Sequence, residues 1–430
     1  MRIRGMKRII LLGIPHFNWK LIRFLTKKRE FKNLRLFLKK SSYGNIIPQQ
    51  DHCSSPVEFT SMVTGVKKEK HGIGYGKGSD QEYIKNGRMI TRFDIKTKPI
   101  WDIVQENGMR VGIYHWLLTW PPKKVNGFMV TDRLSQDVRN KTYPKWLSKL
   151  LSEEELKYDI FNPEIAIDLI ERFDVNLFLG MDEWAHGPTH ILWEYLEPVK
   201  GEKRKSKEEV KKGRKELMNY YKWLDTFLKL VSEKFKDANI IIAGDSGMRP
   251  ADYPPTYCTG REVIDLFKKL KIGIQLYAYD VYPPRLPKSH PTLYIPGKTP
   301  REKERIAEML SKIKLKKTGE SFIKDVKWKG NYLSFAFNFH PWLTNYKSGV
   351  IDLILPDGSD FKLWITKSTG VSFPKGGAFI AKGPLIREKL YVRKVNTVDI
   401  TPTILYLLGI NVPTYMDGKI LKIVRDRCEK

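Results

Sequence analysis

The sequence predicts an α/β fold with a mostly parallel sheet and helices on both faces. Short apolar segments rich in Ile, Leu and Val recur along the chain, and segments of helical length separate them. Strands of a parallel sheet are buried on both faces, so they read as continuous apolar runs rather than as alternating ones. With 430 residues, the chain is long enough for one large domain with an insertion or for two domains.

The first predicted elements are a strand and a basic helical region. Residues 8–14 (RIILLGI) form an apolar run that predicts a buried strand. Residues 18–40 place Leu and Ile at helical spacing with Lys and Arg between them, which predicts surface helices whose lysine stems cover the core. Basic amphipathic helices also lie on anionic membranes, and this alternative stays open at this point.

The middle of the chain alternates helical and strand patterns, which is typical of βαβ units and therefore of a parallel sheet. Each predicted strand is a short apolar run, and each predicted helix carries an apolar stripe or a charged face. The predicted helices are residues 99–107, 166–173 and 207–235, and the predicted strands are residues 111–114, 175–180 and 239–243.

The character of the sequence changes after residue 249. Prolines cluster between residues 254 and 291, and one clear helix is predicted over residues 301–313. The turn signal at residues 355–358 (LPDG) predicts a hairpin, and residues 378–408 return to a strand and a helix. We therefore expect residues 1–249 to form the first part of the core, residues 250–345 an inserted cap segment and residues 346–430 the closing part of the core.

The net charge of +29 predicts anionic partners. Phosphate-bearing substrates, nucleic acid and anionic membrane surfaces all fit a basic protein. The lysine-rich run of residues 200–215 lacks interleaved aromatic residues, so we expect no dedicated nucleic-acid motif. Weak binding of an anionic membrane or a polyanion remains an expectation, with residues 18–40 and 200–215 as the candidate regions.

Cysteine usage and apolar run lengths predict a cytoplasmic setting. Only three cysteines occur, namely Cys53, Cys258 and Cys428, which excludes a disulfide framework. The apolar run of residues 9–14 is too short for the core of a signal peptide. No segment approaches the roughly 18 uninterrupted apolar residues of a membrane span.

The segment Ser54-Ser55-Pro56-Val57-Glu58 allows two interpretations. A serine that opens a helix can aim its hydroxyl at an anion, because the backbone N–H groups of a helix N-terminus favour negative charge. Alternatively, Ser55 and Glu58 form a capping box with Pro56 at the first helical position. The local sequence alone leaves both interpretations open.

Polar residues follow two of the predicted strands, at the sheet edge where α/β proteins place their chemistry. Asp182 and His186 are four residues apart, so a helical turn brings both to one side, where they can chelate a divalent metal or simply pair with each other. Asp245 follows the strand of residues 239–243 and can reach a metal or cap a turn.

These motifs, taken in order, resemble those of a known family. The chain is similar to the alkaline phosphatase superfamily, nearest to its type I phosphodiesterase/nucleotide pyrophosphatase branch, which includes predicted phosphohydrolases of archaea. The segments that carry the resemblance are Pro56–Gly72, Pro99–Val130, Asp182 with His186, Gly244–Met248 and Gly376–Gly418.

The resemblance implies an alkaline-phosphatase-like fold and a two-metal site, usually with zinc, at which a Ser or Thr attacks phosphorus. On this basis Ser55 is the candidate nucleophile. Asp182 and His186 match ligands of one metal, and Asp245 matches a ligand of the other.

The chain departs from the family pattern at three ligand positions. Pro15 stands in place of an aspartate, Ser246 in place of a histidine, and residues 370–377 lack a late histidine. Because a catalytic zinc needs about three protein ligands, we expect one divalent ion at most, with zinc as the expected metal and no metal as the alternative. The histidines that could substitute for a missing ligand are His16, His52, His115 and His340.

The expected function is that of a phosphohydrolase or phosphodiesterase acting on an anionic phosphate-bearing substrate, with Ser55 as nucleophile and an altered metal site. The alternative is a catalytically inactive member of the superfamily that binds an anionic partner through its basic surface.

Overall fold

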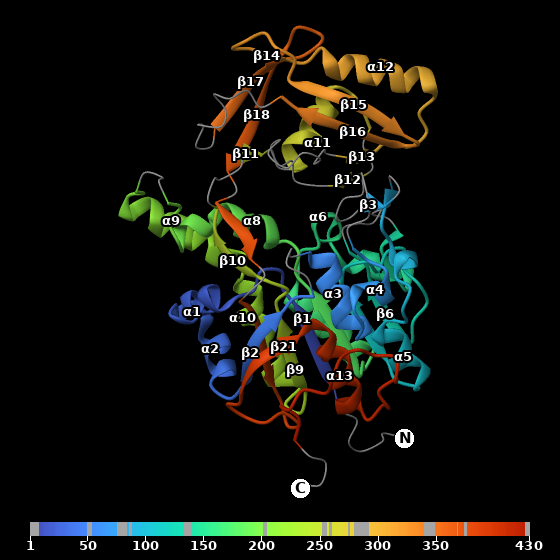
Figure 1. Ribbon diagram of the computed structural model, residues 1–430, viewed down its shortest axis with the longest axis vertical. Helices are drawn as coiled ribbons and strands as arrows, with labels where there is room; N and C mark the ends of the chain where they lie inside the picture. Colours follow the sequence, from blue (N-terminus) through green and yellow to red (C-terminus); the bar gives the residue numbers. More distant parts are fainter. Residues whose placement is uncertain are drawn as a thin grey trace. The chain divides into compact units, whose positions relative to one another are not determined.

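The computed structural model divides the chain into two compact units, and each is described by itself (Figure 1). One unit comprises Met1–Gly74, Thr91–Pro250 and Val371–Lys430, and the other comprises Tyr75–Ile90 and Ala251–Gly370. The sequence-based segments 1–249, 250–345 and 346–430 stay a prediction beside this division. The structure describes residues 8–49, 54–74, 84–85, 88–132, 140–200, 204–251, 256–257, 260–273, 276–278, 292–338, 349–367, 369–373 and 376–425.

The first unit is built on a nine-stranded sheet of order β21-β2-β20-β9-β1-β8-β5-β6-β7. The central strands β9, β1, β8, β5 and β6 run parallel, whereas β20 is antiparallel to both of its neighbours and β7 is antiparallel to β6. The expected mostly parallel sheet is therefore confirmed. The strands are β1 (Ile9–Gly13), β2 (Ser42–Ile47), β5 (Val111–Tyr114), β6 (Gly127–Val130), β7 (Thr142–Tyr143), β8 (Leu177–Met181), β9 (Asn239–Ala243), β20 (Gly377–Lys382) and β21 (Tyr391–Asn396).

Helices cover both faces of this sheet, as the wholly buried strand β1 requires. Alternate residues of β1 point to opposite faces. Ile10 and Leu12 belong to the core cluster that also contains residues of α1, α2, α7 and α10, whereas Gly13 faces Phe59 of α3. The helices are α1 (Trp19–Thr26), α2 (Lys32–Leu38), α3 (Ser55–Thr64), α4 (Lys68–His71), α5 (Ile100–Glu106), α6 (Glu153–Tyr158), α7 (Pro163–Arg172), α8 (His186–Leu192), α9 (Lys207–Asn219), α10 (Lys222–Lys234) and α13 (Ile400–Leu408).

Two helical predictions are refined by the structure. The basic region of residues 18–40 forms α1 and α2, and its apolar residues Leu21, Leu25 and Leu34 are buried in the core, as expected for surface helices. The predicted long helix of residues 207–235 is two helices, α9 and α10. The break falls at Tyr221, which has a non-helical backbone and a buried hydroxyl 2.7 Å from the hydroxyl of Thr189. Burial and hydrogen bonding of this tyrosine thus override the continuous helical pattern.

The register of the central strands brings the candidate residues to one edge of the sheet. Gly13 at the end of β1 pairs with Met181 at the end of β8 and with Ala243 at the end of β9. The segments that follow these three strands therefore leave the sheet at the same level.

The second unit contains two small antiparallel sheets, β11-β18-β17-β14 and β12-β13-β16-β15, with a core of their own. The predicted hairpin is present as β17 and β18. The strands are β3 (Ile84–Lys85), β4 (Arg88–Met89), β11 (Thr256–Tyr257), β12 (Leu276–Ala278), β13 (Thr292–Tyr294), β14 (Lys314–Leu315), β15 (Ile323–Lys329), β16 (Tyr332–Phe337), β17 (Gly349–Ile354) and β18 (Asp360–Lys367). The helices of this unit are α11 (Gly260–Lys269) and α12 (Pro300–Ser311). A separate strand pair joins β10 (Gly247–Pro250) of the first unit to β19 (Gly370–Phe373), whose residues from Val371 on also belong to the first unit.

None of the described helices combines the length and the apolar character that a membrane crossing requires.

Candidate functional site

Ser55 opens helix α3 and points to a carboxylate. Pro56 follows it at the start of the helix, and Ser55 Oγ donates a hydrogen bond of 2.5 Å to Asp245 Oδ2. The capping-box interpretation is wrong, because Ser54 is the residue that caps α3 and its side chain makes no capping hydrogen bond. Glu58 instead accepts hydrogen bonds from the backbone N–H of Gln49 and from Thr397 Oγ1.

Asp245 connects this serine to the segment after β1. Its Oδ1 accepts hydrogen bonds from the backbone N–H of His16, at 2.8 Å, and from Ser246 Oγ, at 3.1 Å. Ser55 and Asp245 are both buried, so this network is shielded from bulk water. The two residues come from distant parts of the sequence and meet at the edge of the sheet, where the strand-end argument places Asp245.

The hydrogen bonds around His16 indicate which ring nitrogen carries its proton. Ser246 Oγ donates to Asp245 Oδ1, so it accepts from His16 Nδ1 at 2.8 Å. A neutral His16 then has its lone pair on Nε2, which lies 3.1 Å from His190 Nε2. Burial, and then the neighbouring His186, hold the pKa of the His16 ring well below its ordinary value, so the ring is neutral at pH 7. A neutral imidazole with a fixed tautomer is the form that binds metals.

Three histidines form a candidate metal centre. One ligand atom from each of His16, His186 and His190 lies within 4.8 Å of the others. Among the residues that the structure describes, these three form the group of His, Cys, Asp or Glu side chains that could hold a metal ion. His186 and His190 are four residues apart on α8, so they lie on one face of the helix. His186 Nδ1 also lies 3.3 Å from Glu183 Oε2, a contact that suits an outer-shell carboxylate.

Asp182 does not belong to this group of mutually close ligand atoms. Its Oδ2 accepts a hydrogen bond of 2.8 Å from Trp223 Nε1, and its Oδ1 accepts one of 3.3 Å from the backbone N–H of Trp184. Burial raises the pKa of Asp182 to about 8, although both hydrogen bonds act in the opposite direction. Burial thus favours the neutral acid while no cation is bound, and a bound cation would act in the opposite direction.

The other histidines proposed as replacement metal ligands either lie away from this group or fall outside the described residues. His115 Nδ1 lies 3.3 Å from Asp159 Oδ1 in a separate buried cluster with Lys141. His52, His340 and Cys53 lie outside the described residues. His190 was not among the sequence candidates, although its spacing of four residues from His186 is a signal that could have found it.

Two buried side chains, those of Glu58 and His71, make polar contacts that hold helix α3 in place. Burial raises the pKa of Glu58 to about 8, against the hydrogen bonds from Gln49 and Thr397. His71 Nδ1 accepts a hydrogen bond from the backbone N–H of Ile73, so its proton is on Nε2, which faces Ser61 Oγ at 3.0 Å. Burial lowers the pKa of His71 to about 4, so the ring is neutral at pH 7. The His-Gly motif therefore has a structural role behind Ser55.

The fold and the position of these residues define an α/β protein of the alkaline phosphatase type. A family model described as type I phosphodiesterase/nucleotide pyrophosphatase matches residues 9–327. The chain belongs to the type I phosphodiesterase/nucleotide pyrophosphatase family, and this membership supports a phosphodiester hydrolase-like function. A search of curated proteins finds no match.

The chain is also similar to solved structures of ectonucleotide pyrophosphatase/phosphodiesterase 5. The human protein is 16% identical with a TM-score of 0.47, and the match covers 98% of this chain and 100% of that chain. The murine protein is 14% identical with a TM-score of 0.47, covering 97% and 100%. An inactive variant of the murine protein in complex with AMP is 15% identical with a TM-score of 0.45, covering 95% and 96%.

Proposed function

We propose that this protein is a phosphodiesterase in which Ser55 is the nucleophile and Asp245 its general base. The observation that carries the proposal is the 2.5 Å hydrogen bond from Ser55 Oγ to Asp245 Oδ2 at the carboxyl edge of the sheet. A hydroxyl becomes an effective nucleophile when a base accepts its proton during attack. The family resemblance matches Asp245 to a metal ligand, whereas we propose that it acts here as the general base.

In the proposed reaction, Ser55 Oγ bonds to phosphorus while its proton passes to Asp245, and the ester oxygen leaves as an alkoxide that takes a proton from solvent. Water then attacks phosphorus and its hydroxyl stays on the product phosphate, while its other proton passes to solvent and Asp245 returns the first proton to Ser55 Oγ as the serine–phosphate bond breaks. The proton released by water balances the one taken by the leaving group, so both steps conserve atoms and charge with water as the only added reactant. The backbone N–H of His16 and the hydroxyl of Ser246 stabilise the Asp245 carboxylate and orient it toward Ser55.

The start of α3 favours an anionic substrate next to Ser55. This helix is ten residues long, and its first turn presents backbone N–H groups at the positive end of its dipole. Ser54 Oγ is buried and has no hydrogen-bond partner among the described residues. A phosphate oxygen would satisfy this hydroxyl. The family description points to nucleotides as the substrate class.

The three histidines fit one zinc ion. Two nitrogens bound to a tetrahedral zinc at 2.0–2.1 Å lie about 3.3 Å apart, close to the 3.1 Å between His16 Nε2 and His190 Nε2. His16 and His190 are buried, which suits neutral imidazole ligands. A bound zinc would supply Lewis-acid polarisation of a phosphoryl oxygen. Pro15 offers no ligand, and the Asp245 oxygens already accept three hydrogen bonds, so we propose at most one ion.

The second candidate function is that of an inactive binder of an anionic partner. The observation that favours it is Asp182, which matches a family ligand in sequence but lies outside the group of three histidines and is hydrogen-bonded to Trp223.

Hydrolysis of bis-(p-nitrophenyl) phosphate, with and without added zinc, distinguishes the two functions. We expect Ser55→Ala to reduce kcat at least about 10³-fold, and Asp245→Asn to reduce it by about 10²- to 10⁴-fold. The matched control is Ser232→Ala on α10, whose exposed hydroxyl only contacts the carbonyl of Lys229. Turnover that Ser55→Ala leaves intact refutes the proposed nucleophile. A wild type without turnover at any metal or pH supports the inactive binder.

A further inference from the structure

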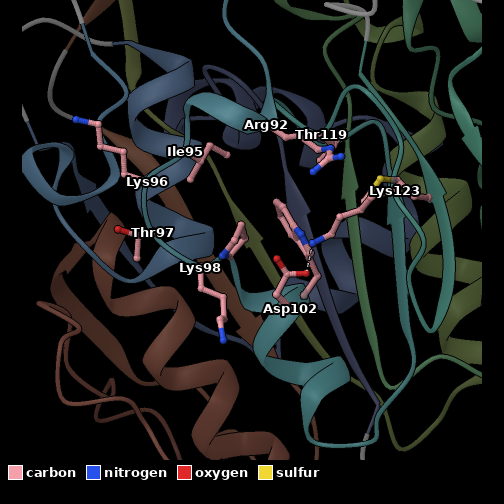
Figure 2. Close-up of a pocket in the computed structure, with 11 residues that line it drawn as sticks. Arg92, Ile95, Lys96, Thr97, Lys98, Asp102, Thr119 and Lys123 are labelled. Atoms are coloured by element: carbon pink, nitrogen blue, oxygen red, sulfur yellow. Dashed lines mark hydrogen bonds and ion pairs between the residues drawn. The ribbon is translucent and has the colours of Figure 1, made fainter.

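We propose that the first unit contains a second anion site, separate from Ser55, which binds a small phosphate-bearing molecule. A cavity of about 290 Å³ lies where the segment before α5 meets the turns around β5 and β6. Four cationic side chains line it, namely Arg92, Lys96, Lys98 and Lys123, together with the single carboxylate of Asp102. Figure 2 shows Lys123 reaching Asp102, whereas the side chains of Lys96 and Lys98 extend with their ammonium ends away from these two residues.

The cations of this cavity are only partly neutralised. Lys123 pairs with Asp102 in the cavity wall, and Lys98 pairs with Glu106 at 2.8 Å. Lys96 makes no ion pair with any of the described residues and is exposed. The lining therefore retains excess positive charge, and a concave surface concentrates such a field.

Arg92 is held in place with donors to spare. Its Nε donates a hydrogen bond of 2.7 Å to the carbonyl of Pro121, and its guanidinium lies 4.1 Å from the ring centroid of Phe93. The guanidinium has five N–H donors in all, and its four terminal ones have no partner among the described residues. An ordered guanidinium with free terminal N–H groups matches the bidentate geometry that phosphate oxygens accept.

The cavity is partly open to solvent and limited in size. Thr119, Met129 and Trp101 line it and are almost wholly buried, so part of its wall is preformed. A volume of 290 Å³ is at the lower end of small-molecule sites. It suits a phosphate group with a small organic substituent. The cavity lining includes neither Ser55, Asp245 nor the histidine group, so occupation of the cavity does not require the candidate active site.

Calorimetric titration of the full-length Ser55→Ala protein with inorganic phosphate and with AMP tests the site. The Ser55→Ala background prevents turnover. We expect Lys96→Glu to weaken phosphate binding at least about tenfold at 0.15 M salt, because it reverses an exposed charge at the site. Arg92→Gln, which retains part of the side-chain packing, is expected to weaken binding to a similar extent.

The matched control is Lys229→Glu, which reverses an exposed lysine on α10 and is expected to leave the affinity unchanged. Equal loss of affinity in this control would show a non-specific charge effect and overturn the proposal. Unchanged affinity in Lys96→Glu and Arg92→Gln, with circular dichroism confirming the fold, also overturns it. Selective loss in these two variants supports the site, and tighter binding of AMP than of phosphate then identifies the organic part as a further contact.

Discussion

The buried His71 makes the stability of the first unit depend on pH in a way that one substitution should remove. In the folded protein its pKa is about 4, against an ordinary value of 6.5, because burial disfavours the charged ring. Protonation would also remove the acceptor for the backbone N–H of Ile73. A histidine with a lowered folded pKa binds fewer protons in the folded state, so stability falls as pH drops from 6.5 toward 4.

The size of this effect follows from the two pKa values. Between pH 7.5 and pH 5, linkage gives a loss of about 2 kcal/mol in the free energy of unfolding from this residue alone. His71→Asn is the matched variant, because an asparagine oxygen can accept from the N–H two residues later, as His71 Nδ1 does. The variant leaves Ser61 Oγ without its donor and should lose about 1–3 kcal/mol at pH 7.5.

Urea unfolding of both proteins at pH 7.5 and pH 5 tests the reasoning. We expect the wild type to lose about 2 kcal/mol more than His71→Asn over this range. The other titrating groups are present in both proteins and cancel in the comparison. Equal losses in the two proteins would show that His71 is charged or accessible to water in the folded state, and would refute its structural role behind α3.

Two further predictions concern the same helix. Burial raises the pKa of Glu58 to about 8, against an ordinary 4.5. The contribution of this residue to the free energy of unfolding is therefore complete below pH 4.5 and is lost as pH rises through 8. Relative to Glu58→Gln, the wild type should therefore lose about 3 kcal/mol of unfolding free energy between pH 5 and pH 8, and parallel pH profiles would contradict this. Gly65 ends α3 with a φ of 69°, and an added Cβ would lie 2.8 Å from Met416 Sδ. Gly65→Ala should lower the free energy of unfolding by more than the about 1–2 kcal/mol of backbone strain. Gly108→Ala, with a φ of 75° and open space around the new Cβ, should show the strain alone, and equal losses would exclude the Met416 contact.

The central strands could be predicted because they are buried on both faces and therefore consist of unbroken apolar runs. The predicted strand of residues 239–243 matches β9 at both ends, and residues 8–14 differ from β1 by one residue at each end. The strands near the edge of the sheet were harder to predict from the sequence. Strand β2 reads SYGNII and alternates buried with exposed residues, because it lies near the edge, so it lacks the apolar run that marks the centre.

The candidate site was partly predictable, for a similar reason. Asp245 was predicted because it follows a central parallel strand, whereas Ser55 follows β2, which was not predicted, and was a candidate only through its helix-start motif and the family resemblance. The raised pKa of Asp182 could not be predicted, because it comes from the burial of this side chain in the folded protein. The role of His16 was equally hidden, since it depends on the hydroxyl of Ser246 fixing the tautomer of the ring.

Zinc content of the purified protein, measured by mass spectrometry after reconstitution and dialysis, tests the central claim most directly. With His16, His186 and His190 as ligands, the wild type should retain about one zinc ion per chain. His190→Ala should lose it, whereas Asp182→Asn, the matched control at a residue outside the histidine group, should keep it. Two ions per chain, no retained zinc in the wild type, or loss in Asp182→Asn with retention in His190→Ala would contradict the three-histidine centre.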